Sequence, residues 1–273
     1  MHEGRRLLSV RRVGRKGCAY RTAEREDEGG LVSLEEGTGE TVNIAYNMDC
    51  MEAMREMPDN AFDLAVVDPP YGINADQFSN GSGASKDKGV YGTAVRCRKK
   101  RLNQGAGKLK GRLLNQSDCS WDSAPPPQEY FTELFRVSKN QVIWGGNYFQ
   151  LPPTRCVLCW DKKQPWPNFS QFELAWTSFD RPAKIFRMAN TMAGKIHPTQ
   201  KPVELYAWIY LEFAKPGDKI LDTHLGSGSS RIAAYDAGLD FWGYEIDEEY
   251  FRKQEERFAA HAAQVSFFDR PEE

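Results

Sequence analysis

Two patterns of apolar positions alternate along the chain from about residue 41 to residue 262. Short continuous apolar runs are typical of buried strands, and segments whose apolar residues return every three or four positions are typical of helices. The first pattern predicts strands at 42–46, 63–67, 141–145, 156–160, 171–177, 219–222 and 241–245. The second predicts helices at 50–57, near 127–137, and at 202–214, 229–237 and 247–262. Strands that alternate with helices are typical of an α/β fold.

The predicted strands fit a doubly wound, mostly parallel, seven-stranded sheet, as in Rossmann-like folds. Runs such as 63-DLAVV-67 have the continuous apolar character of parallel strands that are buried on both faces. The strands at 156–160 and 171–177 flank a ten-residue loop, so we predict that they form an antiparallel hairpin. No internal repeat is visible in the sequence.

Charge divides the chain into segments that the net charge of −2 conceals. Residues 1–25 hold eight Lys or Arg against two Glu, and residues 72–120 hold ten Lys or Arg against three Asp. A basic arm and a basic insertion on an acidic body predict contact with a polyanion. We therefore expect a disordered tail at 1–40, basic and then acidic, a domain at 41–262 that contains the insertion, and a second tail at 263–273.

The composition excludes several classes of protein. Hydrophobic residues make up 40% of 273 positions, which suffices for a sizeable core. No apolar run approaches the roughly 18 residues of a membrane span, and no signal segment opens the chain, so we expect a cytoplasmic protein. Among six Cys, only Cys156 and Cys159 have C-x-x-C spacing. We expect free thiols there, with a zinc or redox site as the alternative.

The segment 221-LDTHLGSGSSRIAA-234 carries a strand, a glycine turn and a helix in that order. Ligands of open α/β sheets bind beyond the carboxyl ends of the strands, where Gly226 and Gly228 let the backbone approach closely. Glu245 ends the next strand, where it can accept hydrogen bonds from ribose hydroxyls. Arg231 replaces the third glycine of the dinucleotide fingerprint, which favours S-adenosylmethionine over a dinucleotide. A structural glycine turn is the remaining alternative.

The stretch 63-DLAVVDPPYGI-73 ends a predicted strand with a carboxylate, two prolines and a tyrosine. Prolines stiffen the loop and supply no N–H, so the Asp68 carboxylate and the Pro69 carbonyl can both act as acceptors. Two acceptors match the two hydrogens of a planar amino group, and the Tyr71 ring can stack on a base. The stretch therefore predicts a pocket for the exocyclic amino group of a nucleobase.

Together, these two segments resemble the amino-group DNA methyltransferases, in which D-P-P-Y is the catalytic motif. The resemblance covers about residues 41–262, and the catalytic motif precedes the cofactor glycines, as in the β class of the family. One departure is Thr223-His224, where the family usually has Pro-Phe. The matching blocks are 47-NMDCMEAMREMPDNAFDLAVVDPPYGI-73, 141-QVIWGGNYF-149, 195-KIHPTQKPVELYAWI-209, 221-LDTHLGSGSS-230 and 243-GYEID-247.

The resemblance implies roles for particular residues and no metal site. Three of the assignments have simpler alternatives: Asp49 as a helix cap, Lys201 as a solvated charge and His197 as a loop residue bonded to backbone. The implied catalytic residues are Asp68, Pro69, Pro70 and Tyr71. The implied cofactor-binding residues are Asp49, His197, Thr199, Lys201, Asp222, Gly226, Ser227, Gly228 and Glu245.

The basic insertion follows the D-P-P-Y loop directly, so we expect it to clamp DNA, with a solvated loop as the alternative. The tip of the predicted hairpin at 161–170 is a weaker candidate for contacts with bases. The expected DNA-binding residues are Arg96, Arg98, Lys99, Lys100 and Arg101 of the insertion, and Lys162, Lys163 and Trp166 of the tip.

The resemblance implies an adenine-specific methyltransferase that transfers the methyl group of S-adenosylmethionine directly to the N6 amino group of a flipped-out base in double-stranded DNA. The amino nitrogen of cytosine is the first alternative target, because Asp in the first motif position only tends to accompany adenine. A protein-glutamine methyltransferase and a non-catalytic DNA-binding module are further alternatives. The recognition sequence, a restriction partner and homodimer formation stay open.

Overall fold

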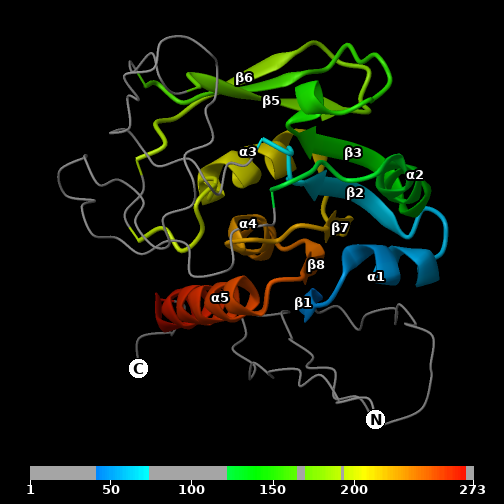
Figure 1. Ribbon diagram of the computed structural model, residues 1–273. Coiled ribbons are helices and arrows are strands. Elements are labelled where there is room, and N and C mark those ends of the chain that lie inside the picture. The colour runs from blue at the N-terminus through cyan, green and yellow to red at the C-terminus, as the bar shows by residue number, and fades with distance from the viewer. Residues whose placement is uncertain (1–40, 74–121, 165–169, 192–193, 269–273) are drawn as a thin grey trace.

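The computed structural model describes residues 41–73, 122–164, 170–191 and 194–268. Its centre is an eight-stranded sheet with the strand order β1-β8-β7-β2-β3-β5-β4-β6 (Figure 1). The strands are β1 (Asn43–Asn47), β2 (Phe62–Val67), β3 (Ser138–Trp144), β4 (Leu158–Asp161), β5 (Phe172–Thr177), β6 (Lys184–Arg187), β7 (Lys219–Asp222) and β8 (Asp240–Glu245).

The sheet confirms the predicted mostly parallel α/β architecture. Strand β5 pairs antiparallel with both β3 and β4, whereas every other strand pair of the described residues is parallel. The hairpin of β4 and β5 is therefore confirmed. The predicted number of seven strands was too low, because β6 was missed. Within the described part of the chain this four-residue edge strand pairs with β4 alone, and its Lys-Ile-Phe-Arg sequence lacks the apolar run of a buried strand.

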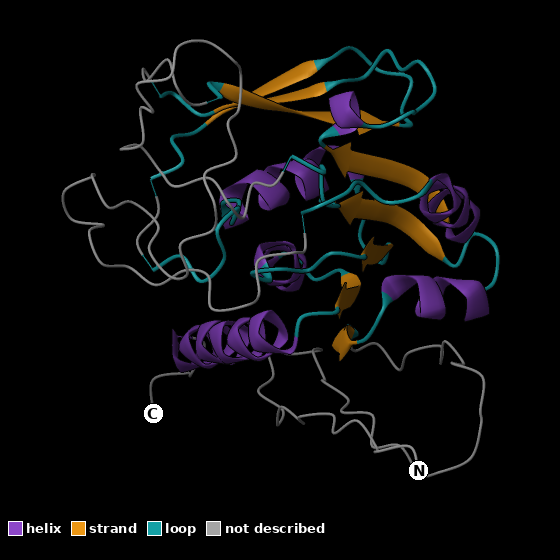
Figure 2. Ribbon diagram, viewed as in Figure 1, coloured by secondary structure: helices purple, strands orange, loops and turns teal. Residues whose placement is uncertain are grey.

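Helices cover both faces of the sheet, as a doubly wound fold requires (Figure 2). One hydrophobic cluster joins α1 and α2 to one face, and a second joins α3 and α4 to the other. Helix α5 packs against α4 and continues the second layer. The helices are α1 (Cys50–Glu56), α2 (Gln128–Val137), α3 (Val203–Phe213), α4 (Ser229–Asp236) and α5 (Glu248–Phe268), with a short 3-10 helix at Gly146–Tyr148.

Helix α5 corrects the predicted boundary near residue 262. It continues to Phe268, so the first part of the expected tail at 263–273 is helical. The segment 258-FAAHAAQ-264 explains the extension, since Ala is the strongest helix former. The described helices include none that is long and apolar enough to cross a membrane. The expected tail at 1–40 and the insertion from residue 74 on lie outside the described residues.

The pairing of β2 with β7 positions the site. The two strands are parallel neighbours, with Leu64 opposite Ile220 and Ala65 opposite Leu221. Asp68 directly follows β2, and Asp222 is the last residue of β7. Because the carboxyl ends of parallel strands meet at one edge, the D-P-P-Y loop and the glycine turn emerge side by side.

Candidate active site

The D-P-P-Y loop is fixed by hydrogen bonds on both sides of the prolines. The Tyr71 hydroxyl donates to Asp68 Oδ1 at 2.7 Å, and the N–H of Gly72 donates to Asp122 Oδ1 at 2.8 Å. Pro69 between them is buried. Asp122 had not been predicted as part of the site, because it lies 50 residues further along the chain. The loop therefore presents the Asp68 carboxylate in a fixed position.

The Tyr71 ring packs against the segment that follows β3. Its partners are Tyr148, stacked at a centroid distance of 4.9 Å, and Phe149, edge-on at 6.1 Å. Gly145 lies so close that a Cβ built there would be 2.2 Å from the ring, and its φ of +70° is itself unfavourable for other residues. Tyr148, a 45% exposed residue, therefore covers one face of the Tyr71 ring, and the stacking of a base on Tyr71 stays a prediction.

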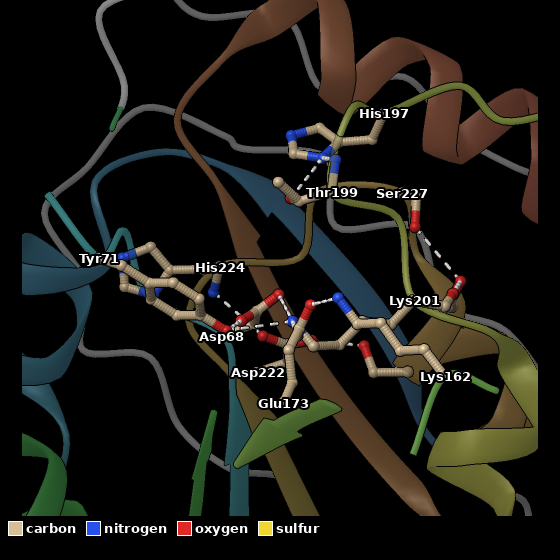
Figure 3. A network of polar contacts seen from close by, with 12 residues as sticks. Asp68, Tyr71, Lys162, Glu173, His197, Thr199, Lys201, Asp222, His224 and Ser227 are labelled. Atoms are coloured by element: carbon tan, nitrogen blue, oxygen red, sulfur yellow. Dashed lines mark hydrogen bonds and ion pairs between the residues drawn. The ribbon is translucent and has the colours of Figure 1, made fainter. Parts of the chain in front are cut away.

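Lys201 connects the D-P-P-Y loop to the antiparallel hairpin (Figure 3). Its side chain is only 3% exposed, and its ammonium group donates a hydrogen bond to Asp68 Oδ2. The same Nζ lies 3.3 Å from the Tyr71 hydroxyl and 3.2 Å from Oε2 of Glu173 in β5. Lys162 pairs with the other oxygen of Glu173. Lys201 is therefore not the solvated charge of the simpler alternative, and its contact with the cofactor stays a prediction.

Burial and the number of neighbouring ammonium groups together determine the pKa of each carboxylate in this network. Burial raises the pKa of Glu173, but the ammonium groups of Lys201 and Lys162 outweigh it and hold the pKa at about 2. Burial also raises the pKa of Asp68, and here one ammonium group does not reverse the effect. For Lys201, burial lowers the pKa, whereas Asp68 and Glu173 raise it above its ordinary value. The ammonium form of Lys201 is thus favoured.

The glycine turn holds its carboxylates with backbone N–H groups and a hydroxyl. Asp222 accepts from the Ser230 hydroxyl and, at 3.0 Å, from the N–H of His224. Glu245 accepts from the N–H of Gly226 at 2.7 Å. Burial raises the pKa of both Asp222 and Glu245 to about 7.

These features of the turn fit S-adenosylmethionine. Neither Asp222 nor Glu245 takes part in an ion pair within the described residues. The buried Asp222 and the partly buried Glu245, without a paired cation in the described part of the chain, are suited to a ligand that carries sulfonium and ammonium charges. Gly226 and Gly228 both have positive φ values, of +51° and +71°, which favour glycine, and the close approach of a ligand to them stays a prediction.

His197 lies beside the glycine turn. A Cβ at Gly226 would be 3.8 Å from the His197 ring, which also packs edge-on against Tyr250 at 4.3 Å. Burial, and then the charges of Lys201 and Lys253, lower the pKa of His197 to about 3, so the ring is neutral at pH 7. Its Nδ1 accepts from the N–H of Thr199 at 3.3 Å.

Ser229 ties the glycine turn to the Lys201 segment. Its hydroxyl donates to the backbone oxygen of Lys201 at 2.8 Å and lies 3.2 Å from the hydroxyl of Ser227.

The structure therefore brings together most of the residues that the resemblance implied. Asp49 caps α1 through a 2.8 Å bond from the N–H of Met51, as its simpler alternative expected, and its predicted contact with the cofactor is untested.

The departure at Thr223-His224 forms a polar contact that Pro-Phe could not make. The Thr223 hydroxyl lies 2.6 Å from the Tyr130 hydroxyl and 2.9 Å from His224 Nδ1. The His224 ring packs edge-on against Tyr130 at 5.3 Å. Burial lowers the pKa of His224 to about 4, so the ring is uncharged at pH 7. His224 thus retains the neutral aromatic character of the usual Phe.

Of the predicted DNA-binding residues, the structure describes two lysines, and the other six lie outside the described residues. Lys162 is only 11% exposed and pairs with Glu173, so its side chain belongs to the ion network around Lys201. Lys163 adopts a φ of +49°, and its N–H donates to Asp161 Oδ1 at 2.9 Å. Contact of either lysine with DNA stays a prediction. Outside the described residues lie Arg96, Arg98, Lys99, Lys100, Arg101 and Trp166.

Comparisons with known proteins find similarity to DNA methyltransferases. A family model described as DNA methylase, for the N6 and N4 enzymes, matches residues 160–256. The type II methyltransferase M.BglII of Bacillus subtilis is 24% identical over 242 residues, which are 77% of this chain and 67% of that protein. M2.DpnII of Streptococcus pneumoniae is 24% identical over 263 residues, 85% of this chain and 95% of that protein.

Among solved structures, the complex of M1.HpyAVI with S-adenosylmethionine is similar at 17% identity and a TM-score of 0.47, over 78% of this chain and 98% of that one. The family model and both relatives are DNA methyltransferases, and this chain is similar to them. The family-model match includes Glu173, Lys201 and the glycine turn, but it begins at residue 160, after Asp68. The catalytic assignment of the D-P-P-Y loop therefore stays a prediction from the sequence motif.

Proposed function

We propose that this protein is an S-adenosylmethionine-dependent DNA methyltransferase that methylates the N6 amino group of adenine. The observation that carries the proposal is the placement of Asp68 and Asp222 at the ends of neighbouring parallel strands. One edge of the sheet thereby joins an acceptor for an amino group to a glycine turn suited to a cationic nucleoside cofactor.

The chain's residues have separate tasks in this reaction. Asp68, with the Pro69 carbonyl, accepts the two hydrogens of the base amino group and orients its nitrogen. When bound, S-adenosylmethionine supplies an electrophilic methyl group, so the N–C bond forms while the C–S bond breaks and sulfur keeps the electron pair. Asp68 stabilises the positive charge that develops on the nitrogen before its proton is released. The proposed reaction needs no covalent enzyme intermediate.

Asp222 and Glu245 are proposed to hold the cofactor. Their raised pKa values make them responsive to a cation, because a positive ligand favours the ionised carboxylates. Gly226 and Gly228 leave room beside the backbone. His197, neutral and next to Gly226, provides a hydrogen-bonding surface that adds no charge.

Duplex DNA is the proposed substrate, and the target base is proposed to leave the stack and lie against Tyr71. Adenine is proposed because the motif begins with Asp. The amino group of cytosine presents the same two hydrogens, and the matching family model covers both N6 and N4 enzymes. The cytosine amino nitrogen is therefore the second candidate.

The test is transfer of labelled methyl from S-adenosylmethionine to mixed-sequence duplex DNA, followed by digestion to nucleosides and mass spectrometry. We expect the label in N6-methyl-2′-deoxyadenosine. Label in N4-methyl-2′-deoxycytidine would keep the proposed reaction but change the target base to cytosine. Absence of label in DNA, while calorimetry shows that the cofactor binds, would contradict the proposal and direct attention to protein or RNA substrates.

A further inference from the structure

We propose that Glu173 is a positioning residue that shares the Lys201 ammonium with Asp68, and thereby leaves Asp68 able to accept hydrogen bonds from the base. The inference rests on the proposed function, because it concerns the acceptor strength of Asp68 in that reaction. Neither the motif analysis nor the D-P-P-Y loop pointed to Glu173, which lies 105 positions beyond Asp68 in the sequence.

Four charged side chains alternate in sign across the carboxyl edge of the sheet (Figure 3). Lys162 pairs with Glu173, Glu173 lies 3.2 Å from Lys201, and Lys201 pairs with Asp68. The hairpin fixes the first pair, because the N–H of Lys162 donates to the backbone oxygen of Gln171 at 2.9 Å. Glu173 is therefore held in place from the side away from Asp68.

The Lys201 ammonium has three hydrogens and faces three oxygens, those of Asp68, Tyr71 and Glu173. A buried ammonium group that loses one anionic partner binds the other more tightly, because burial strengthens the remaining attraction. Without the Glu173 charge, the Lys201 ammonium would bind the Asp68 carboxylate more tightly. The amino group of the base would then have to displace this ammonium group to reach Asp68.

The groups around Asp68 and Lys201 show how the Glu173 charge acts on their pKa values. Asp68 is influenced by Lys201, Tyr71 and Glu173 of β5, and its own charge acts on Tyr206 in α3 and Asp222 in β7. Lys201 faces Asp68 and Glu173, the rings of Tyr71 and Trp144, and His197. Of these groups, Glu173 is the carboxylate that raises the pKa of both Asp68 and Lys201.

Removal of the Glu173 charge should therefore shift both titrations in the same direction. In Glu173→Gln, the pKa of Asp68 falls, so the acid limb of the pH–rate profile moves to lower pH. The pKa of Lys201 also falls, so a basic limb that reports Lys201 moves to lower pH as well. We expect shifts of about one pH unit and a fall in kcat of about tenfold at neutral pH.

The matched control is Glu212→Gln. Glu212 pairs with Lys184 between α3 and β6, in an ion pair of the same kind that contacts neither Asp68 nor Lys201. Its removal should leave both limbs of the profile in place. A Glu173→Gln enzyme with a lower rate but an unshifted profile would show that Glu173 merely supports the fold, and it would overturn the inference.

A measurement without turnover separates this inference from the proposed function. The carboxyl carbon of Asp68, assigned with an Asp68→Asn variant, is titrated by carbon-13 NMR in the wild type and in Glu173→Gln, without DNA or cofactor. A lower midpoint in the variant supports the inference even if the wild type methylates no DNA. An unchanged midpoint overturns it even if the wild type methylates DNA as proposed.

Should Glu173→Gln fail to fold, Glu173→Asp provides the second variant. It keeps the charge but withdraws the carboxylate by one methylene, so the interaction with Lys201 weakens without being removed. We expect smaller shifts of both limbs in the same direction. Limbs that stay at their wild-type positions would again contradict the sharing of Lys201.

Discussion

The two ends of the site hold their carboxylates with different partners. At the D-P-P-Y end, Asp68 and Glu173 both pair with the Lys201 ammonium, and Glu173 also pairs with Lys162. At the glycine turn, Asp222 is held by a hydroxyl and a backbone N–H, without an ion pair within the described residues. The chain thus balances the charge of one end itself and, within the described residues, leaves Asp222 without a paired cation, which fits the proposed binding of a neutral base at the first end and a cationic cofactor at the second.

Asp68→Ala should break the D-P-P-Y end while the glycine turn survives. The variant removes the acceptor for the amino hydrogens and leaves Lys201 with Glu173 alone. We expect kcat to fall at least about a hundredfold, with the affinity for S-adenosylmethionine within about threefold of wild type. Methyl-transfer kinetics and calorimetry measure the two quantities. Turnover at a comparable rate would remove Asp68 from the catalytic assignment; Asp180→Asn, in the exposed pair with Arg155, is the control.

Gly145→Ala should damage the same end through Tyr71. The added Cβ would lie 2.2 Å from the ring, so Tyr71 must shift, and we expect about a hundredfold loss of kcat. Gly238→Ala is the matched control, because Gly238 has a similar φ of +66° but no atom within 4 Å of an added Cβ. Both variants should lose stability to backbone strain, by about 1–2 kcal/mol in thermal unfolding. Equal activity of the two variants would contradict the role of the Tyr71 contact.

Asp222→Asn should weaken the glycine turn while the D-P-P-Y end survives. It removes the charge that is proposed to face the cofactor, so we expect the Kd for S-adenosylmethionine to rise about tenfold to a hundredfold. The apparent kcat at saturating cofactor should change less than in Asp68→Ala. Asp218→Asn, immediately before β7 and bonded to the N–H of Lys215, is the control. A Kd unchanged by Asp222→Asn would refute the proposed cofactor site.

The affinity for S-adenosylmethionine should depend on pH at the glycine turn. Burial gives Asp222 and Glu245 pKa values of about 7, so both are partly protonated in the free protein at neutral pH. A cationic ligand favours the ionised forms, so binding releases protons. Each carboxylate contributes about a tenfold increase from pH 6 to pH 8, so affinity should rise roughly a hundredfold over this range and then level off. Calorimetry in buffers of different ionisation enthalpy counts the protons, and uptake instead of release would contradict the assignment.

The local parts of the site were predicted from the sequence because each lies within one short segment. The strand before Asp68, the turn at Gly226 and Gly228, and the strand that ends at Glu245 all occur at their predicted places. Hydrophobic periodicity and glycine positions report local backbone conformation, and they suffice for such segments. Edge strand β6 was missed because it is only partly buried and carries charged ends.

The partners of these segments were decided by the tertiary structure alone. Lys201 meets Asp68 across 133 positions of sequence, Gly145 accommodates the Tyr71 ring, and Glu173 reaches Lys201 from an antiparallel strand. No local pattern encodes such contacts, because they depend on the order in which the strands assemble. The sequence by itself determined that an acceptor loop and a glycine turn exist. The strand order placed them at one edge of the sheet and brought a second carboxylate to the lysine between them.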